Sequence, residues 1–338
     1  MVTFGFVVHP TTIEQLKEFW PATKILPDFI LKTWLKSLPP FKISRVSGVR
    51  SIQGKEIQGF LIGCPLLPQQ MLELKENFVL DKIIRAGRLA ERLGAHILGL
   101  GGYTSIVGDK GYTIAKNLKI PVTSGNSLTA WSVFEAIYRT AKVKNIDLRK
   151  STLAVIGATG SIGSLCAKKL SDYTAKIIIT ARHRDKLEKL KETLNHLNRV
   201  EVVIEQDAHQ AVKDADIVIT TTSAPEALLK IEEFKPGAIV CDVSIPKNVN
   251  GRKENRPDVT LIDGGLIKLP FSANFGVDTG LPKDIIYASM AETMLLALEE
   301  NLVSYSLGDN INIDKLEEIA NIAARHGFEV WVPEAGIA

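Results

Sequence analysis

Hydrophobic positions follow two patterns in the first 150 residues. Short apolar runs at 4–8 and 96–100 predict strands, whereas most of residues 1–75 shows no regular period. Apolar residues recur with helical spacing over 80–93, and a second helix is predicted from about 128 to 142. The first part of the chain is therefore expected to be a mixed α/β domain.

Beyond Ser151, short apolar runs alternate with helical segments. The runs predicted to be strands are 153–156, 176–180, 200–204, 217–221, 238–241 and 259–262. The charged amphipathic stretch 185–197 predicts a helix between the second and third of these runs. Strands that alternate with helices are typical of a doubly wound, Rossmann-type parallel sheet.

Two more helices are predicted after the last strand. One spans 283–304, with Pro282 suited to its first turn, and the other spans 314–326 and ends before Gly327. Because both follow the sheet in the sequence, we expect them to pack back across the junction between two domains. The predicted organisation is an N-terminal α/β substrate domain over 1–130, a Rossmann domain over 131–282 and bridging C-terminal helices over 283–338.

Length and charge narrow the functional classes. The 338 residues fit two domains, since single cores rarely grow beyond roughly 250 residues. The net charge of +3, from 41 basic and 38 acidic residues, argues against a nucleic-acid binder. The N-terminus lacks a signal-peptide pattern, and no apolar run has the length of a transmembrane helix, which predicts a cytoplasmic protein. The sequence leaves the oligomeric state open.

The cysteines offer no metal site. Cys64, Cys166 and Cys241 are far apart and form no pair with metal-ligand spacing, so no bound metal is expected. An odd number of separated cysteines fits reduced thiols. Because free cysteines are most often buried in a core, a catalytic role is the less favoured interpretation of each.

A glycine-rich turn follows the first strand of the predicted sheet. Its pattern is G-x-x-G-x-x-G, between an apolar strand and a helix, which is the context of a dinucleotide-binding turn. Glycines allow the backbone to approach the pyrophosphate, and the N-terminus of the helix offers N–H donors. The residues predicted to contact the cofactor here are Gly157, Ala158, Thr159, Gly160, Ser161, Ile162 and Gly163. The alternative is a turn that serves only to pack a helix on a sheet.

The end of the second strand favours NADPH over NADH. NAD-binding domains place an acid there for the ribose 2′-hydroxyl, but this strand ends without one. Thr180, Arg182 and Arg184 are instead suited to a 2′-phosphate, because guanidinium groups bind phosphate through paired donors. The alternative for the arginines is a solvated entry to the next helix.

Polar residues after later strands are expected to line the nicotinamide half of the crevice. These predicted cofactor contacts are Thr221, Thr222, Ser223, Gly264 and Gly265. Lys247 follows another strand and is a candidate catalytic residue, with an ordinary loop lysine as the equal alternative.

Candidate substrate and acid–base residues lie outside the glycine turn. The candidates for binding a substrate carbonyl or phosphate, or for lining the crevice, are Tyr103, Thr104, Ser105, Asn126 and Thr129. Glu292 lies three residues after Ser289, on the same face of a predicted helix, and His326 ends the last helix. For these last two, a helix-surface or capping role is the favoured alternative to general acid–base catalysis.

Several segments together point to a family. They are 100–105, 123–126 with 129–130, 155–163, 180–182, 245–248, 263–265, 288–295 and 325–328. In this order they resemble the long-chain acyl-[acyl-carrier-protein] reductases, the aldehyde-forming enzymes of cyanobacteria, and bacterial relatives described as amino-acid or shikimate-type dehydrogenases. The resemblance runs from near residue 60 to about 328.

The resemblance implies a reaction. A cysteine takes the acyl group from a thioester of acyl carrier protein or coenzyme A, and NADPH then delivers hydride to release a fatty aldehyde. A thiolate suits this role because it is a strong nucleophile and a good leaving group. The N-terminal domain would hold the acyl chain.

At the nucleophile the chain departs from the family pattern. The position of the family's cysteine holds Ser289, and a serine hydroxyl needs a general base near pH 7. The serine is interpreted as a replacement that disables the enzyme, as a natural divergence with altered activity, or as a sign that hydride goes directly to a bound carbonyl. The alternative functions are therefore an NAD(P)-dependent dehydrogenase of a small hydroxy or amino acid, and an inactive NADP-binding regulatory protein.

Overall fold

The computed structural model describes residues 1–197, 200–224, 226–251, 253–309 and 311–332. The chain forms two compact units. Unit 1 consists of Met1–Gly125, Lys268–Gly308 and Asn321–Glu329, and unit 2 consists of Asn126–Ile267, Asp309–Ala320 and the chain from Val330. The predicted two-domain α/β fold is confirmed.

Unit 1 contains a five-stranded sheet with the order β2-β3-β1-β4-β5. Its strands are β1 (Thr3–Val8), β2 (Phe41–Arg50), β3 (Glu56–Gly63), β4 (Ile97–Leu100) and β5 (Val122–Thr123). Only β2 is antiparallel to its neighbour. The four parallel strands therefore bring the residues that follow them, among them His9, Gly101 and Ser124, to one edge of the sheet.

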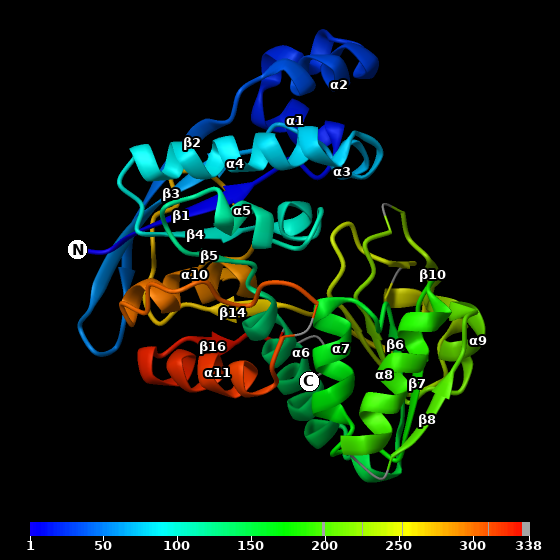
Figure 1. Cartoon of the computed structure of the whole chain (residues 1–338). Coiled ribbons are helices and arrows are strands. Elements are labelled where there is room, and N and C mark those ends of the chain that lie inside the picture. The colour runs from blue at the N-terminus through cyan, green and yellow to red at the C-terminus, as the bar shows by residue number, and fades with distance from the viewer. Residues whose placement is uncertain (198–199, 225, 252, 310, 333–338) are drawn as a thin grey trace. The chain divides into compact units, whose positions relative to one another are not determined.

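Helices α4 (Glu76–Arg92) and α10 (Ala288–Leu298) cover opposite faces of this sheet (Figure 1). Glycines permit the close approach on each side. A Cβ added at Gly5 would lie 2.8 Å from Ala90 of α4, and one added at Gly99 would overlap the hydroxyl of Thr293 in α10. Each helix therefore packs close to the backbone of the sheet.

The start of unit 1 is more helical than its sequence pattern predicts. The short helices of this unit are α1 (Ile13–Phe19), η1 (Pro21–Ile25), α2 (Asp28–Ser37), α3 (Pro68–Glu73), η2 (Gly102–Ser105) and α5 (Tyr112–Lys116). Helices α1 and α2 share a small core of their own, made by Ile13, Leu16, Leu31, Leu35 and Leu67. With only two buried positions on each helix, the period is too short to be recognised in the sequence.

The predicted helix over 283–304 is wrong at both ends. Strand β15 (Ile285–Tyr287) precedes α10, and α10 ends at Leu298. Asp284 has a φ of 63° and Glu300 a φ of 57°, so neither residue continues a right-handed helix. The β-branched residues of β15 also favour a strand over a first helical turn.

Unit 2 is built on a six-stranded parallel sheet with the order β13-β11-β9-β6-β7-β8. Its strands are β6 (Thr152–Ile156), β7 (Lys176–Thr180), β8 (Glu201–Ile204), β9 (Ile217–Thr220), β11 (Ile239–Asp242) and β13 (Thr260–Asp263), and its helices include α6 (Asn126–Val143), α7 (Ser161–Leu170), α8 (Arg184–Leu197) and α9 (Ala208–Lys213) (Figure 1). This is the predicted doubly wound fold. The strand order reverses direction at β6, so the turn after β6 opens at the switch point where such sheets bind ligands.

The remaining elements are short, except for the last helix. They are η3 (Leu148–Lys150), β10 (Leu229–Lys230), η4 (Ile231–Glu233), β12 (Val249–Asn250), η5 (Lys253–Asn255), β14 (Leu266–Lys268), α11 (Asp314–His326) and β16 (Glu329–Val330). Helix α11 has the bounds that the sequence predicts. Across the described ranges, no helix combines the length and the apolar character that crossing a membrane requires.

Candidate functional site

In unit 2 the glycine turn between β6 and α7 is held by the end of β7. The N–H groups of Gly157 and Ala158 both donate to the carbonyl oxygen of Thr180, at 2.9 and 3.0 Å. Gly157 has a φ of 87°, and a Cβ there would lie 2.9 Å from the carbonyl oxygen of Thr221. The turn thus requires glycine at its first position for two independent reasons.

The other two glycines differ in what surrounds them. A Cβ on Gly163 would overlap the carbonyl oxygen of Gly157 and lie 2.7 Å from the Thr221 hydroxyl, so this glycine packs α7 against the strands. A Cβ on Gly160 would meet only the Gly157 carbonyl oxygen, at 3.3 Å. Gly160 therefore leaves the side of the turn open where the N-terminus of α7 offers its donors to an anion.

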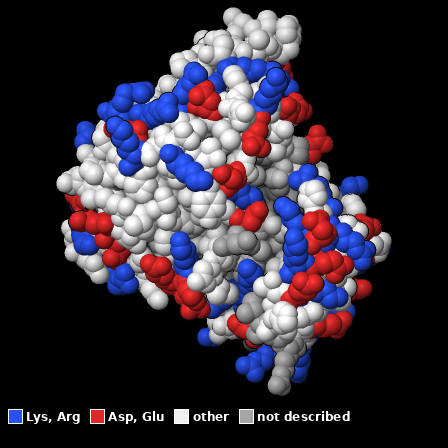
Figure 2. Space-filling model, in the orientation of Figure 1, with Lys and Arg blue, Asp and Glu red and all other residues white. Residues whose placement is uncertain are grey.

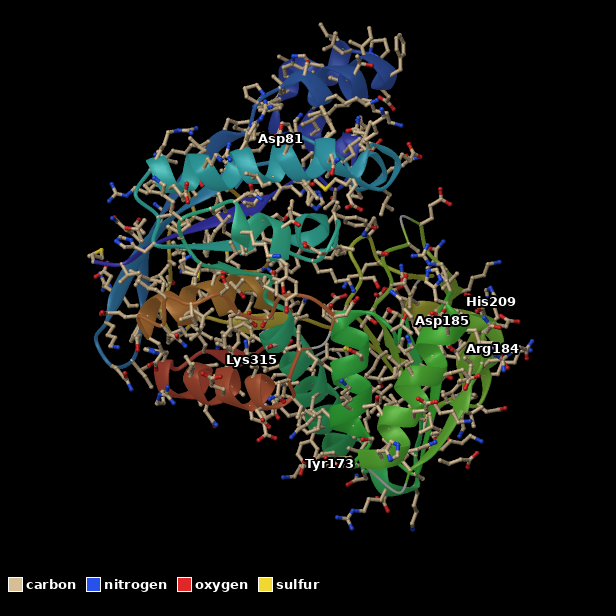
Figure 3. All side chains as sticks on the ribbon, viewed as in Figure 1. Asp81, Tyr173, Arg184, Asp185, His209 and Lys315 are labelled. Carbon is tan, nitrogen blue, oxygen red and sulfur yellow. The ribbon has the colours of Figure 1, made fainter. Side chains whose placement is uncertain are left out.

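The end of β7 carries an unsatisfied polar group. Within the described ranges the buried Thr180 hydroxyl has no hydrogen-bond partner. Arg182 is exposed just beyond it, and Arg184 (labelled in Figure 3) pairs with Glu188 one turn along α8, at 3.4 Å. A buried hydroxyl without a partner, two residues before an exposed arginine in the sequence, fits a phosphate or ribose group of a bound cofactor.

A second polar cluster follows β11 and is organised by the buried carboxylate of Asp242. One carboxylate oxygen accepts the Thr220 hydroxyl at 2.7 Å and the Ser244 N–H at 3.0 Å. The other oxygen accepts the N–H groups of Asn248 and Val249, at 2.8 and 3.0 Å. Four donors thus fold the loop after β11 around one carboxylate.

Asn248 lies in this loop and has a side-chain donor without a partner in the described residues. Its side-chain oxygen accepts hydrogen bonds from the hydroxyls of Thr222 and Ser244, while its Nδ2 is buried without a partner in the part of the chain that the structure describes. An unsatisfied amide donor at the carboxyl edge of the sheet fits the polar groups of the nicotinamide half of a dinucleotide. The sequence motif contained Asn248, but its side chain received no role there.

Lys247 lies in the same loop but is engaged by neighbours. Its Nζ donates to the carbonyl oxygen of Asp242 at 2.9 Å and lies 3.0 Å from a carboxylate oxygen of Asp263. These contacts tie the loop to the end of β13. The predicted catalytic role of Lys247 stays a prediction.

Several other predicted residues are brought together within unit 2. Thr129, in α6, lies near Gly265, where an added Cβ would meet its methyl group at 3.4 Å. Gly265 has a φ of 79°, and Gly264 packs against the thiol of Cys241. Asn126, at the start of α6, is buried, and Thr159, Ser161 and Ile162 lie where the turn enters α7.

In unit 1 the position of interest is the second residue of α10. Ser289 is half-buried there, in the first turn, where backbone N–H groups lack helical acceptors and the helix dipole stabilises negative charge. Gly125, with a φ of 76°, packs on it so closely that a Cβ would overlap the Ser289 Cα. Among the described residues, no side chain is hydrogen-bonded to the Ser289 hydroxyl.

Glu292 does not share the exposure of Ser289. It is fully buried, and its carboxylate accepts the Thr123 hydroxyl at 2.5 Å. Thr123 Oγ1 in turn accepts the Gly125 N–H at 3.3 Å. The expected helix-surface alternative is therefore wrong, because Glu292 ties the loop after β5 to the helix that carries Ser289.

The turn after β4 is organised by a histidine that the sequence pattern does not single out. His9 Nε2 accepts the N–H of Tyr103 at 3.0 Å, and its Nδ1 lies 3.0 Å from the carbonyl oxygen of Pro10. These two bonds fit a neutral ring with its proton on Nδ1. Thr104 and Ser105 donate their hydroxyl protons to the carbonyl oxygens of Gly101 and Gly102, at 2.8 and 2.7 Å, so these protons already stabilise the turn.

Acidification is expected to destabilise unit 1 through His9. Burial lowers the pKa of the ring below its usual value of 6.5, so the unfolded chain binds a proton more readily than the native one. The stabilisation is complete above pH 6.5 and is lost as the pH falls below that value. Urea unfolding from pH 8 to pH 5 measures it, and His9→Gln, which keeps an acceptor for the Tyr103 N–H, should show a smaller loss. An equal loss in both proteins would contradict the assignment.

His326 is placed in a structural network. The ring is buried, with Nδ1 2.7 Å from the Ser51 hydroxyl and Nε2 3.0 Å from the carboxylate of Glu299. Burial lowers its pKa, against the opposing effect of Glu299. Arg325 pairs with the same carboxylate at 2.8 Å. These contacts join α11 to the end of α10, and the predicted acid–base role stays a prediction.

The cysteines are buried, as the sequence indicates. Burial raises the pKa of Cys64 and of Cys241 to about 12 and raises that of Cys166 as well. None of the three is a thiolate near neutral pH, so none takes the place of a nucleophile at position 289. In the described ranges, no three His, Cys, Asp or Glu side chains are grouped to hold a metal ion.

Comparisons with known proteins agree with the nature of unit 2. The sequence model of the shikimate/quinate 5-dehydrogenase family matches residues 139–264, all of which belong to this unit. Unit 2 is therefore an NAD(P)-binding domain of the dehydrogenase and reductase kind. Among solved structures, the L-tryptophan dehydrogenase of Nostoc punctiforme aligns with a TM-score of 0.42 and 13% identity, over 96% of this chain and 80% of that one.

Two curated proteins match almost the whole chain. The long-chain acyl-[acyl-carrier-protein] reductase of Synechococcus elongatus is 28% identical over 344 residues, which cover 96% of this chain and 98% of that protein. Aminotransferase PigE of a Serratia strain is 28% identical over 345 residues, which cover 97% of this chain but only 39% of PigE. The chain is thus a distant relative of an acyl-carrier-protein reductase along the full length of both.

Proposed function

We propose that the protein binds NADPH on unit 2 and reduces a long-chain acyl thioester of acyl carrier protein or coenzyme A to a fatty aldehyde, with position 289 as the site of acyl transfer. The observation that carries this proposal is the place of residue 289, in the first turn of α10 beneath Gly125, in a chain related over its full length to an acyl-carrier-protein reductase. Serine at that position makes turnover slow.

The residues of unit 2 would hold the cofactor at the carboxyl edge of the sheet. The glycine turn and the N-terminus of α7 would bind the pyrophosphate, and Thr180 with Arg182 would bind the 2′-phosphate. The unsatisfied Nδ2 of Asn248 would donate to the nicotinamide half. The chemistry that NADPH supplies when bound is a hydride.

In unit 1 the side chain at position 289 would attack the thioester carbonyl. The carbonyl carbon forms a bond to this side chain, the bond to the carrier sulfur breaks, and the carrier leaves as a thiol. Addition of a hydride to the same carbon, with the side chain at 289 leaving and taking up a proton from water, would release the aldehyde. A sulfur nucleophile forms a thioester that accepts hydride readily, whereas serine forms a less reactive oxyester and needs a base to activate it.

The Ser289→Cys variant is therefore expected to produce aldehyde at least roughly 100-fold faster than the native chain. The assay follows the oxidation of NADPH, and separately of NADH, with a long-chain acyl-coenzyme A. Mass spectrometry without cofactor should show the variant, but not Ser289→Ala, gaining one acyl group. The proposal fails if the cysteine variant binds NADPH yet neither acquires an acyl group nor forms aldehyde.

The match to the shikimate/quinate dehydrogenase family favours a second candidate, the oxidation or reduction of a small hydroxy acid. That match ends at residue 264 and includes no residue of unit 1, so it concerns the cofactor domain rather than the substrate. This candidate would be favoured if the native chain turned over a small hydroxy acid and the Ser289→Ala variant did so at the same rate.

A further inference from the structure

Large apolar side chains gather on the outer surface of α1, η1 and α2 in unit 1. The members of this apolar patch are Phe19, Ile25, Phe29, Ile30 and Trp34. Ile25 is 87% exposed and Phe29 is 71% exposed. Scattered single exposures need no explanation, but here five such side chains lie within 16 consecutive residues.

The patch is not needed to fold the segment that carries it. The inward faces of α1 and α2 are filled by their own core, which includes Leu31 and Leu35. The end of α2 is held by Lys82 of α4, whose Nζ donates to the carbonyl oxygens of Leu35 and Lys36 at 3.0 and 2.7 Å. Gln70 donates to the carbonyl oxygen of Lys32 at 2.8 Å. The outward side chains are therefore presented on an anchored platform.

Basic residues accompany the patch. In η1 and α2 these are Lys24, Lys32 and Lys36, and the only acid there, Asp28, pairs with Lys17 at 2.7 Å. Glu14 and Glu18 are exposed on α1, the helix that carries Phe19. Figure 2 shows this end of unit 1, at the top of the view, as a white surface with blue and some red side chains at its base. An apolar tip with lysines beside it is an arrangement found in interfacial membrane-binding elements.

We propose that the α1–α2 segment docks on the surface of an anionic lipid bilayer, with Ile25 and Phe29 entering the interface and Lys24, Lys32 and Lys36 facing lipid phosphates. An anionic bilayer offers both features that the patch complements, an apolar layer and a continuous negative surface. The apolar side chains stand outward from short helices, which suits insertion between lipids better than the flat contact of a second copy of the chain.

The inference goes beyond the proposed reduction and does not depend on it, because lipid binding needs neither cofactor nor acyl substrate. Should the chain reduce long-chain thioesters, docking would place a sparingly soluble aldehyde at the bilayer where it is released.

Sedimentation of the full chain with vesicles tests the inference. The chain is expected to bind vesicles that contain phosphatidylglycerol, to bind phosphatidylcholine vesicles more weakly, and to be released by salt. The double variant Ile25→Asp/Phe29→Asp should bind at least roughly tenfold more weakly. Phe271→Asp/Val303→Asp introduces the same charge at two other half-exposed positions of unit 1 and should bind like the native chain.

Three results would overturn the inference. One is the absence of binding to anionic vesicles, and another is equal loss in the two double variants. The third is a concentration-dependent dimer that Ile25→Asp/Phe29→Asp abolishes while vesicle binding is absent, since that would assign the patch to a second copy of the chain. Circular dichroism establishes that each variant is folded, and NADPH binding on unit 2 should be unchanged in all of them.

Discussion

The variant Gly125→Ala is expected to lose roughly 3–5 kcal/mol of folding free energy, enough to unfold a marginal domain at physiological temperature. Two effects add. The φ of 76° disfavours any residue with a Cβ, and that Cβ would overlap the backbone of Ser289 and lie 2.9 Å from its carbonyl oxygen. The neighbouring atoms are the Cα, Cβ and carbonyl oxygen of Ser289, whose positions follow the backbone of α10, so no rotamer change relieves the overlap.

Gly94→Ala is the matched control for this prediction. Gly94 has a φ of 85°, but an added Cβ there meets nothing within 4 Å, so only the backbone term remains, about 1 kcal/mol. Urea unfolding of the two variants separates conformational strain from overlap. Equal losses would mean that the loop after β5 does not press on Ser289, and the description of the site in unit 1 would have to be abandoned.

The close contact also joins position 289 to the loop after β5. The loop that carries Gly125 is joined to α10 by the Thr123–Glu292 hydrogen bond on one side and by packing on Ser289 on the other. Gly125 packs on the Cα and Cβ of Ser289, which serine and cysteine have in common. The exchange of oxygen for sulfur at this position therefore alters its chemistry more than its packing.

The nucleotide domain could be predicted from the sequence because its signals are local. The turn from Gly157 to Gly163, the strand before it and the helix after it lie within twenty residues, and each reports the same unit. The alternation of strands and helices then fixes the doubly wound sheet. The unsatisfied polar groups of Thr180 and Asn248 could not be predicted in the same way. Whether such a group finds a hydrogen-bond partner depends on which side chains from other strands lie close to it in the fold.

The site in unit 1 resisted prediction because it is assembled from distant segments. His9 meets Tyr103 across 94 positions, and Thr123 meets Glu292 across 169. The spacing of residues along the sequence gives no sign that such distant residues are in contact. The helical spacing after Pro282 misled the prediction of α10 for a related reason, since the positive φ of Asp284 follows from the tertiary path of the chain. What the sequence conveys about Ser289 comes from its family resemblance, whereas its surroundings come from the fold.

The second and third glycines of the turn should separate stability from cofactor binding. Gly163→Ala is expected to cost about 2–4 kcal/mol, because its Cβ would overlap the Gly157 carbonyl oxygen and approach the Thr221 hydroxyl to 2.7 Å. Gly160→Ala should keep stability within about 1 kcal/mol, because its φ of −74° and ψ of 163° suit any residue and its nearest contact is 3.3 Å away.

For NADPH affinity, the variant expected to show the larger loss is Gly160→Ala rather than Gly163→Ala. A methyl group on Gly160 would stand on the open side of the turn, where the pyrophosphate must approach the backbone, so NADPH affinity should fall by about tenfold or more in a folded protein. Thermal unfolding gives the first quantity, and quenching of tryptophan fluorescence by NADPH gives the second. If Gly160→Ala binds NADPH like the native chain, the pyrophosphate does not cross this turn. If Gly163→Ala is as stable as the native chain, α7 is not packed through that glycine, and the orientation of its N-terminus toward a phosphate loses its structural basis.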